Sequence, residues 1–317
     1  MQQRSPKKRF RLFDSQREGP GVLKNERPLK YDFYSYFVRM GRNMNKLLTV
    51  NILYVVGNFP LFFLIAALAG LTNITSTAPD NLLFPALHGV MLHDEVGMLP
   101  LFGVLGGQAE LSAYSTGTYV LLGLSALLIF TFGPVNAGTA YVLRNIVSGE
   151  PVFVWGDFWY AVKRNWKQSL VYGILDALIL AILSYDFLFF LKNFASLPTS
   201  VLFYATIACA IIYGFMRYYL YLMMVTFDLS IFKLIKNALI FSILGFGRNL
   251  LATIGIALIF LVNLFLFVYI PGLGIALPFV ITVALMSYTS GFVAYYKIKD
   301  VMIDPYYTKT DPSAEEE

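Results

Sequence analysis

The sequence predicts an all-α integral membrane protein with six transmembrane helices in three hairpins, cytoplasmic interfacial amphipathic helices, and both termini in the cytoplasm. Hydrophobic residues make up 57% of the 317-residue chain and charged residues only 14%, whereas soluble domains carry roughly 25% charged residues. The apolar residues gather in segments of about 20 residues or more, the length that crosses a bilayer. Nearly all Lys and Arg fall on one side of these segments, which sets the orientation.

Three regions follow from the distribution of polar residues. Residues 1–45 form a basic cytoplasmic N-terminal region, whose polar start is not typical of a cleaved signal peptide. Within it we expect a short amphipathic helix over 31–44, carrying Phe33, Tyr34, Phe37 and Met40 on one side. Residues 46–296 form the six-span membrane domain, and residues 297–317 form a polar cytoplasmic tail.

The first two spans enclose the longest loop. We place span one at 47–71, kinked at Pro60, and span two at 119–143, bent at Gly133-Pro134. The outer loop 72–118 between them contains apolar runs at 82–87 and 98–105. Because bare apolar patches mark interaction sites, we expect short helices there that pack on the outer ends of the spans or on a partner.

Four further spans complete the domain. They are expected at 168–190, 201–225, 249–268 and 275–296. The segment 228–246 reads as a second amphipathic helix on the cytoplasmic side, and Pro271-Gly272 begins a tight turn between the last two spans.

The basic residues are distributed very unevenly between the two sides. Lys192 is the single basic residue on the outer side, out of 24 Lys and Arg in the chain, and the loop 72–118 has none. The remaining basic residues lie in the N-terminal region, the loops after spans two and four, and the tail. The positive-inside rule therefore places both termini in the cytoplasm, and six spans satisfy that parity.

The dipeptide Arg-Asn precedes three spans, at Arg42-Asn43, Arg164-Asn165 and Arg248-Asn249. Each time an amphipathic segment with aromatic residues precedes it. We interpret this as three helical hairpins, each introduced by an interfacial helix, and repeats of this kind are common in transport proteins.

All three tryptophans lie between spans two and three, at Trp155, Trp159 and Trp166. At about 100° per residue they sit at roughly 0°, 40° and 20° on one face of a single helix. Lys163 lies on the flank of that face and Arg164 on the opposite side. This pattern favours a helix in the membrane–water interface that contacts lipid or a partner; the alternative is an amphipathic helix packed on protein.

Three polar residues lie deep within predicted spans. Asp176 on span three and Arg217 on span four are each about 13 Å from the cytoplasmic ends of their helices, at 1.5 Å per residue, and Asn136 on span two is similarly deep. Because spans three and four are neighbours, we expect Asp176 and Arg217 to pair. The pair serves either a polar pathway or gate, or a structural role that fixes helix register.

The motifs of several protein classes are missing from the sequence. It has no nucleotide-binding Gly-Lys-Ser/Thr loop, so we expect no ATPase activity and no other enzyme activity. His88 and His93 share the outer loop at a spacing poorly suited to one metal ion. We therefore predict no catalytic, metal or cofactor site, and no nucleic-acid partner.

Several segments of the sequence resemble the YesL-like family of bacterial membrane proteins, catalogued as domain of unknown function 624. They are Gly133-Pro134, Tyr141-Val142-Leu143-Arg144, Val154-Trp155-Gly156-Asp157-Phe158, Lys163-Arg164-Asn165 and Phe227-Asp228-Leu229. The resemblance covers roughly residues 19–300 and brings no catalytic motif with it. It implies a genomic context beside carbohydrate ABC importers of Gram-positive bacteria.

We therefore expect a non-catalytic accessory subunit of a bacterial oligosaccharide ABC importer, in the cell membrane, whose partners are importer permeases and lipids. One alternative is the translocating permease itself. Such permeases carry a cytoplasmic Glu-Ala-Ala loop followed by Gly, and neither 144–168 nor 226–248 contains one. A second alternative is a membrane-embedded sensor or regulator of glycan uptake, and a third is a small independent transporter.

Overall fold

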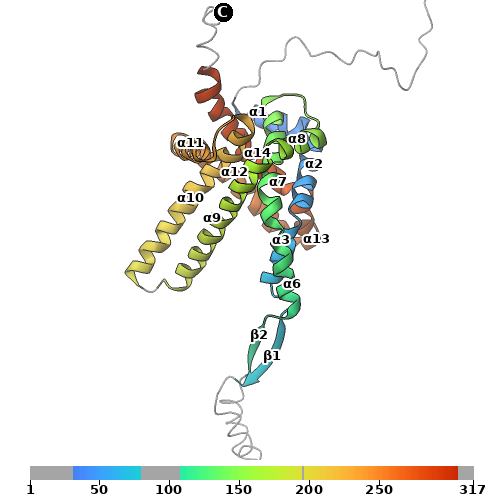
Figure 1. Ribbon diagram of the computed structural model, residues 1–317, viewed down its shortest axis with the longest axis vertical. Helices are drawn as coiled ribbons and strands as arrows, with labels where there is room; N and C mark the ends of the chain where they lie inside the picture. Colours follow the sequence, from blue (N-terminus) through green and yellow to red (C-terminus); the bar gives the residue numbers. More distant parts are fainter. Residues whose placement is uncertain (1–30, 80–107, 195, 306–317) are drawn as a thin grey trace, which may run out of the picture.

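The computed structural model describes residues 31–79, 108–194 and 196–305. Most of these residues are helical (Figure 1). Within the described ranges five helical stretches are long and apolar enough to cross a membrane, and a bent helix pair would add a sixth. They are Thr116–Ser148, Trp166–Lys192, Leu197–Thr226, Phe246–Tyr269 and Pro271–Ile303. The chain is thus a helical membrane protein, as its composition predicts.

The first helices are α1 (Phe33–Arg42), α2 (Met44–Gly57) and α3 (Pro60–Leu68). Helix α1 is the predicted amphipathic helix. Its N-cap, Asp32, accepts a hydrogen bond from the backbone N–H of Ser35 at 2.6 Å, which holds the pKa of that carboxyl below its usual range. Helices α2 and α3 meet at 63°, with Pro60 in the first turn of α3, so the predicted kink at Pro60 is confirmed.

A two-stranded ribbon follows α3, where we predicted a loop with short helices. Strand β1 (Ile74–Pro79) pairs antiparallel with β2 (Gln108–Ala113), and Ile74 is opposite Ala113. The ribbon extends from one end of the molecule (Figure 1). The two strands lie far apart in the sequence, so no short turn motif indicates a hairpin. Sequence analysis therefore did not predict that they pair. The expected helices at 82–87 and 98–105 lie outside the described residues.

The predicted second span consists of α6 (Thr116–Ser125) and α7 (Leu128–Ser148). We expected the bend at Gly133-Pro134, but the helix is interrupted at residues 126–127 and α7 contains Pro134 in its interior. Helix α7 ends at Gly149, whose φ of 84° is the left-handed conformation that favours glycine at a helix C-terminus.

The tryptophan segment is two helices instead of one. Helix α8 (Val154–Arg164) ends at Asn165, and Trp166 begins α9 (Trp166–Lys192). The predicted single face with all three tryptophans is therefore wrong, because the chain breaks before the third. The Asn165 side chain donates a hydrogen bond to the carbonyl of Ala161 at 3.0 Å and so terminates α8. Helix α10 (Leu197–Thr226) follows, opened by a capping box of Ser196 and Thr199.

The last helices are α11 (Ile231–Leu244), α12 (Phe246–Tyr269) and α13 (Pro271–Leu277), followed by η1 (Pro278–Thr282), α14 (Val283–Ile298) and η2 (Lys299–Ile303). Helix α11 lies where we predicted a second amphipathic helix, but apolar side chains occupy both of its faces: Leu234 and Phe241 are buried, whereas Phe232 and Ile243 are more than half exposed. The turn before α13 is tight, because a Cβ on Gly274 would collide with the backbone of Phe267. The predicted polar tail, which we separated from the membrane domain at residue 297, is helical as far as residue 305.

The same order of elements recurs three times: an amphipathic helix, a break, and two long helical stretches. At each break, or within one turn after it, an asparagine side chain donates to carbonyls at the end of the preceding helix. Asn43 donates to the Arg39 carbonyl at 3.0 Å, as Asn165 does to that of Ala161, and Asn249 reaches the Ser242 carbonyl at 3.1 Å. The recurring Arg-Asn dipeptide of the sequence therefore has a structural role in capping.

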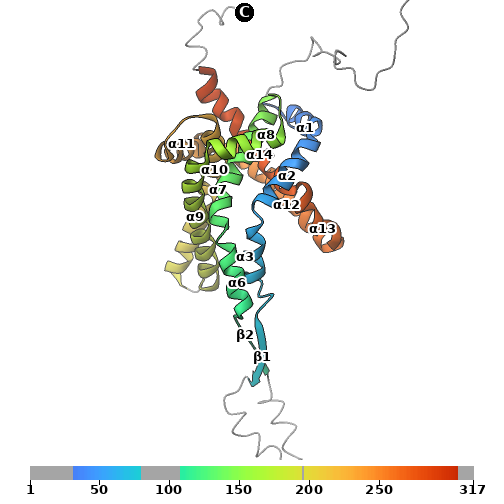
Figure 2. The ribbon, with the colours of Figure 1, turned by 45° about the vertical axis from the view of Figure 1, so that its right-hand side comes forward.

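Helices α1, α8 and α11 lie at the same end of the molecule as the last turns of α14, and we call this the amphipathic end (Figures 1 and 2). Burial concentrates near this end. Helix α9 has its buried residues between Ser169 and Asp176, whereas Leu178, Ile182 and Leu188 further along are more than half exposed. Apolar side chains exposed over the length of several helices are the expected lipid-facing surface.

Candidate functional site

The deepest charged residues of the bundle form one network. Asp176 on α9 is fully buried, and one of its carboxylate oxygens lies 2.9 Å from Nε of Arg217 on α10. The two residues thus form the ion pair that the sequence predicts. The hydroxyls of Tyr213 and Tyr221 donate to the same carboxylate at 2.7 and 2.9 Å. Asp176 is therefore surrounded by donors, which is what a buried carboxylate requires.

A close crossing of α7 and α9 sets the position of this network. A Cβ on Gly133 would collide with the carbonyl of Ser169, and a Cβ on Gly173 would collide with the backbone of Gly133. Small residues at such a crossing let two helix backbones touch. Asn136 and Asp176 each follow their crossing glycine by three residues, about one helical turn, so each lies next to the crossing.

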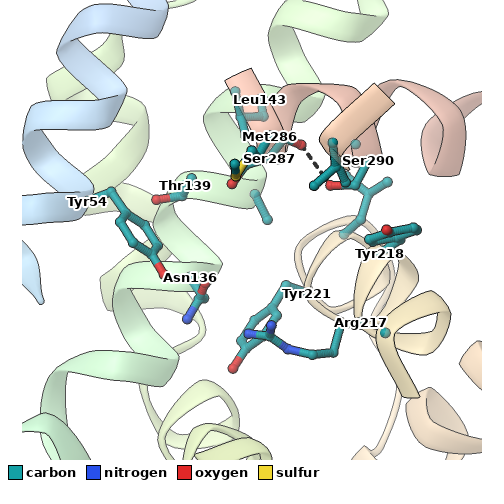
Figure 3. A pocket seen from close by; sticks show the side chains of 15 residues that line it. Tyr54, Asn136, Thr139, Leu143, Arg217, Tyr218, Tyr221, Met286, Ser287 and Ser290 are labelled. Carbon is teal, nitrogen blue, oxygen red and sulfur yellow. Dashed lines mark hydrogen bonds between the residues drawn. The ribbon is translucent and has the colours of Figure 1, made fainter. Parts of the chain in front are cut away.

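A cavity of about 270 Å³ lies beside the ion pair, between α2, α7, α10, α12 and α14. Figure 3 shows Arg217 and Tyr221 on one side of it and Tyr54, Asn136 and Thr139 on the other. Ser287 and Ser290 of α14 complete the polar part of the lining. Asp176 is not among the lining residues; it supports Arg217 from behind.

The hydrogen-bonding groups of the cavity are unequally satisfied. Asn136 donates to the Phe132 carbonyl at 2.7 Å. Thr139 is 4% exposed, and its hydroxyl has no hydrogen-bond partner within the described structure. A buried hydroxyl without a partner costs free energy and so needs an explanation. Sequence reasoning found Asn136 but missed Thr139, although a spacing of three places both on one helix face.

Charge is balanced at the cavity. The Arg217 side chain is 30% exposed while that of Asp176 is 0% exposed, so the guanidinium faces the cavity and its counter-ion does not. Nε and Nη2 of Arg217 donate to Asp176 at 3.3 and 3.2 Å. The remaining N–H groups of the Arg217 guanidinium can donate hydrogen bonds into the cavity, while the Asp176 carboxylate neutralises the charge of the guanidinium.

Asn51 in the first span has a separate role. Its side chain is fully buried, donates to the Pro278 carbonyl at 2.9 Å and accepts from the Ala284 N–H at 2.8 Å. Pro278 begins the single π-helical turn η1 and Ala284 follows it, so Asn51 satisfies backbone groups on both sides of a segment whose hydrogen bonding departs from that of an α-helix. Asn51 is therefore a brace between α2 and α14.

The tryptophans form a second candidate site, at the amphipathic end. Trp155 and Trp159 on α8 are 61% and 48% exposed, while Phe158 between them is buried. Trp166 starts the next helix and is also exposed. Two of the three predicted tryptophans thus share a helix, and the third lies across the break.

A polar pocket of about 460 Å³ brings Trp166 together with basic residues of the same segment. Lys163, Arg164, Trp166 and Lys167 line it together with Asp228. Arg164 also lies 6.0 Å from the ring centre of Tyr160, a cation–π contact. Exposed indole rings beside basic side chains suit the boundary between lipid headgroups and water.

The described residues contain no group of three His, Cys, Asp or Glu side chains that could hold a metal ion. The cavity beside Arg217 instead offers hydroxyl, amide and guanidinium groups, which bind by hydrogen bonding.

Residues 112–187 match the family described as "Protein of unknown function, DUF624". The match supports the DUF624 family for this chain. It runs from the end of β2 into α9 and so contains Asn136, Thr139, Trp155 and Asp176, whereas Arg217 lies beyond it. No curated protein and no solved structure matches the chain.

Proposed function

We propose that this protein is a non-catalytic accessory subunit of a bacterial carbohydrate ABC importer in the cell membrane. In this proposal the six spans form three hairpins with both termini in the cytoplasm. The resemblance to the YesL-like family supplies the importer context, and the DUF624 match is consistent with that resemblance. The protein would act by binding permease subunits, without hydrolysing ATP itself.

The distribution of charge supports this orientation. Lys163, Arg164 and Lys236 lie on or beside the helices of the amphipathic end, while Lys192 ends α9 at its opposite end. Loops on the cytoplasmic side of a membrane protein carry more Lys and Arg than loops on the outer side. The amphipathic end would therefore face the cytoplasm, and the ribbon would lie outside.

The surface formed by α1, α8 and α11 at one end carries the proposal. Phe33 on α1 is 72% exposed, Trp155 on α8 is 61% exposed and Phe232 on α11 is 78% exposed. Large rigid aromatic side chains are enriched at protein interfaces, where they supply most of the binding energy. Three such helices around one end provide a wide surface for the cytoplasmic part of a permease.

Copurification from the native host tests this proposal. Full-length tagged protein, extracted in mild detergent, should retain importer permeases that mass spectrometry identifies. The double substitution Trp155→Ser and Trp159→Ser should reduce their recovery, because it removes two large contact side chains. Tyr185→Ser is a matched control, since Tyr185 is 67% exposed but lies in the outer half of α9. Purification of the folded wild-type protein without any importer permease would contradict the proposal.

The polar cavity favours a second candidate, the translocating permease itself. Polar groups inside a membrane domain are costly and mark solute pathways in many transporters. Uptake of labelled sugar into proteoliposomes that contain this protein alone would support that candidate. Uptake that requires the importer permeases as well would favour the accessory role.

A further inference from the structure

We propose that the cavity beside Arg217 is a binding site for a small, uncharged, hydroxyl-rich molecule such as a polyol or monosaccharide. An accessory subunit that only docks on permeases needs no ligand of its own, so this site goes beyond the proposed function. Four features of the cavity carry the inference: its size, its charge balance, its unpartnered hydroxyl and its aromatic walls.

The size limits the ligand. The cavity measures about 270 Å³, just below the range of roughly 300–1,000 Å³ that is typical of sites for drug-sized ligands. Neither a whole oligosaccharide nor a lipid with its chains fits inside this volume. A single small ring or a short polyol matches it.

The charge balance favours an uncharged ligand. Among the lining residues that the structure describes, Arg217 alone is charged, and the Asp176 carboxylate neutralises it at 2.9 Å. An ion entering the cavity would lose its hydration without meeting an unbalanced opposite charge. A neutral molecule avoids that cost and can still accept hydrogen bonds from the free guanidinium N–H groups.

The hydrogen-bonding groups favour hydroxyls on the ligand. Thr139 has a hydroxyl that is buried in the cavity wall without a partner in the described structure. A hydroxyl both donates and accepts, and a small shift of that wall would let a bound ligand reach it. Tyr54 and Asn136 point toward the same region in Figure 3, from two different helices. A ligand with several hydroxyls could satisfy these groups at once.

The rings of Tyr54, Tyr218 and Tyr221 form the aromatic part of an apolar lining that also contains aliphatic side chains such as Leu143 and Ile256. A site with a few convergent polar groups on aromatic walls is the usual composition of a small-molecule pocket. The C–H faces of a polyol or sugar ring can pack on such walls while its hydroxyls bond to the polar groups.

Equilibrium binding to full-length protein in lipid nanodiscs tests this site. Tritiated D-glucose is the probe, and unlabelled myo-inositol and glycerol are the neutral competitors. Sodium acetate and sodium phosphate are the anionic competitors. We expect saturable binding that neutral polyols displace and the anions do not. No saturable binding to folded protein, or displacement by the anions alone, would overturn the proposal.

Substitutions in the lining test whether the sugar binds in this cavity. Thr139→Val removes the unpartnered hydroxyl with little change in shape, and losing one hydrogen bond should weaken binding about fivefold. Thr131→Val is the matched control, because Thr131 lies on the same helix with an unpartnered buried hydroxyl but does not line the cavity. Equal weakening by both variants would place the binding elsewhere and overturn the proposal.

Ser290→Ala provides a second variant on another wall of the cavity, in case Thr139→Val does not fold. Ser290 donates to the Ser287 carbonyl of its own helix, at 3.0 Å, so its removal should be mild for folding. Weaker glucose binding by this variant supports the site, and unchanged binding by folded variants of both residues contradicts it. Copurification with permeases is a separate measurement, so the two proposals can fail independently.

Discussion

At the residue scale, Asp176 shows how a charge is accommodated within an apolar bundle. Its carboxylate accepts hydrogen bonds from two tyrosine hydroxyls and from Arg217. The sequence indicated the Asp176–Arg217 pair because both lie at equal depth on neighbouring helices. It could not indicate Tyr213 and Tyr221, because tyrosine is common throughout this chain and only tertiary packing distinguishes these two.

The first prediction concerns this pair. Asp176→Ala removes the counter-ion of Arg217 and should destabilise the protein by about 3 kcal/mol or more, because it leaves a partly buried charge without compensation. The double variant Asp176→Ala with Arg217→Ala should lose less stability than the sum of the two single variants. Thermal unfolding in detergent measures all three. Strictly additive losses would show that the two side chains are not coupled.

At the element scale, local sequence patterns predicted most of the helices. They failed for the features that depend on contacts between residues far apart in the sequence. Pro60 marked the break between α2 and α3, since proline cannot continue a hydrogen-bonded helix. The Arg164-Asn165 dipeptide indicated a boundary before span three, but the sequence placed Trp166 on the wrong side of it, because the hydrophobic periodicity continues through Asn165 and only its side-chain cap on Ala161 reveals where α8 ends. The sequence did not predict the cavity either, because its lining residues come from five helices. Which of these helices contact one another cannot be deduced from the spacing of residues along the chain.

The second prediction concerns the crossing of α7 and α9. Gly133→Ala places a Cβ against the Ser169 carbonyl, which is backbone and cannot rotate away. Overpacking of this kind typically costs about 1–3 kcal/mol, and it should also displace Asn136 and Asp176. Thermal unfolding measures the loss.

Gly123→Ala is the control for this substitution, because a Cβ there meets nothing within 4 Å. It should leave the melting temperature unchanged or raise it slightly, since alanine favours helix more than glycine by about 1 kcal/mol. Equal effects of the two substitutions would mean that the crossing tolerates a methyl group.

At the scale of the whole molecule, burial and charge point to the same arrangement. The core lies near the amphipathic end, and the halves of α9, α10 and α12 that lie away from it expose apolar side chains such as Leu188, Val201 and Leu258. Their exposure is favourable only in lipid. The composition of the sequence was sufficient to predict the membrane-spanning helices, because a transmembrane helix needs only sufficient length and hydrophobicity.

The third prediction concerns the orientation of the whole chain. From the split of basic residues we expect the amphipathic end in the cytoplasm and the ribbon outside. Cys209 is exposed and is the one cysteine of the chain, so Cys209→Ala gives a background for single-cysteine labelling. In that background Ser76→Cys, on an exposed position of β1, should react with a membrane-impermeant maleimide in intact cells. Lys236→Cys, exposed on α11, should react only after the membrane is opened. The reverse pattern would invert the topology and move the surface of α1, α8 and α11 outside, away from the cytoplasmic part of any permease.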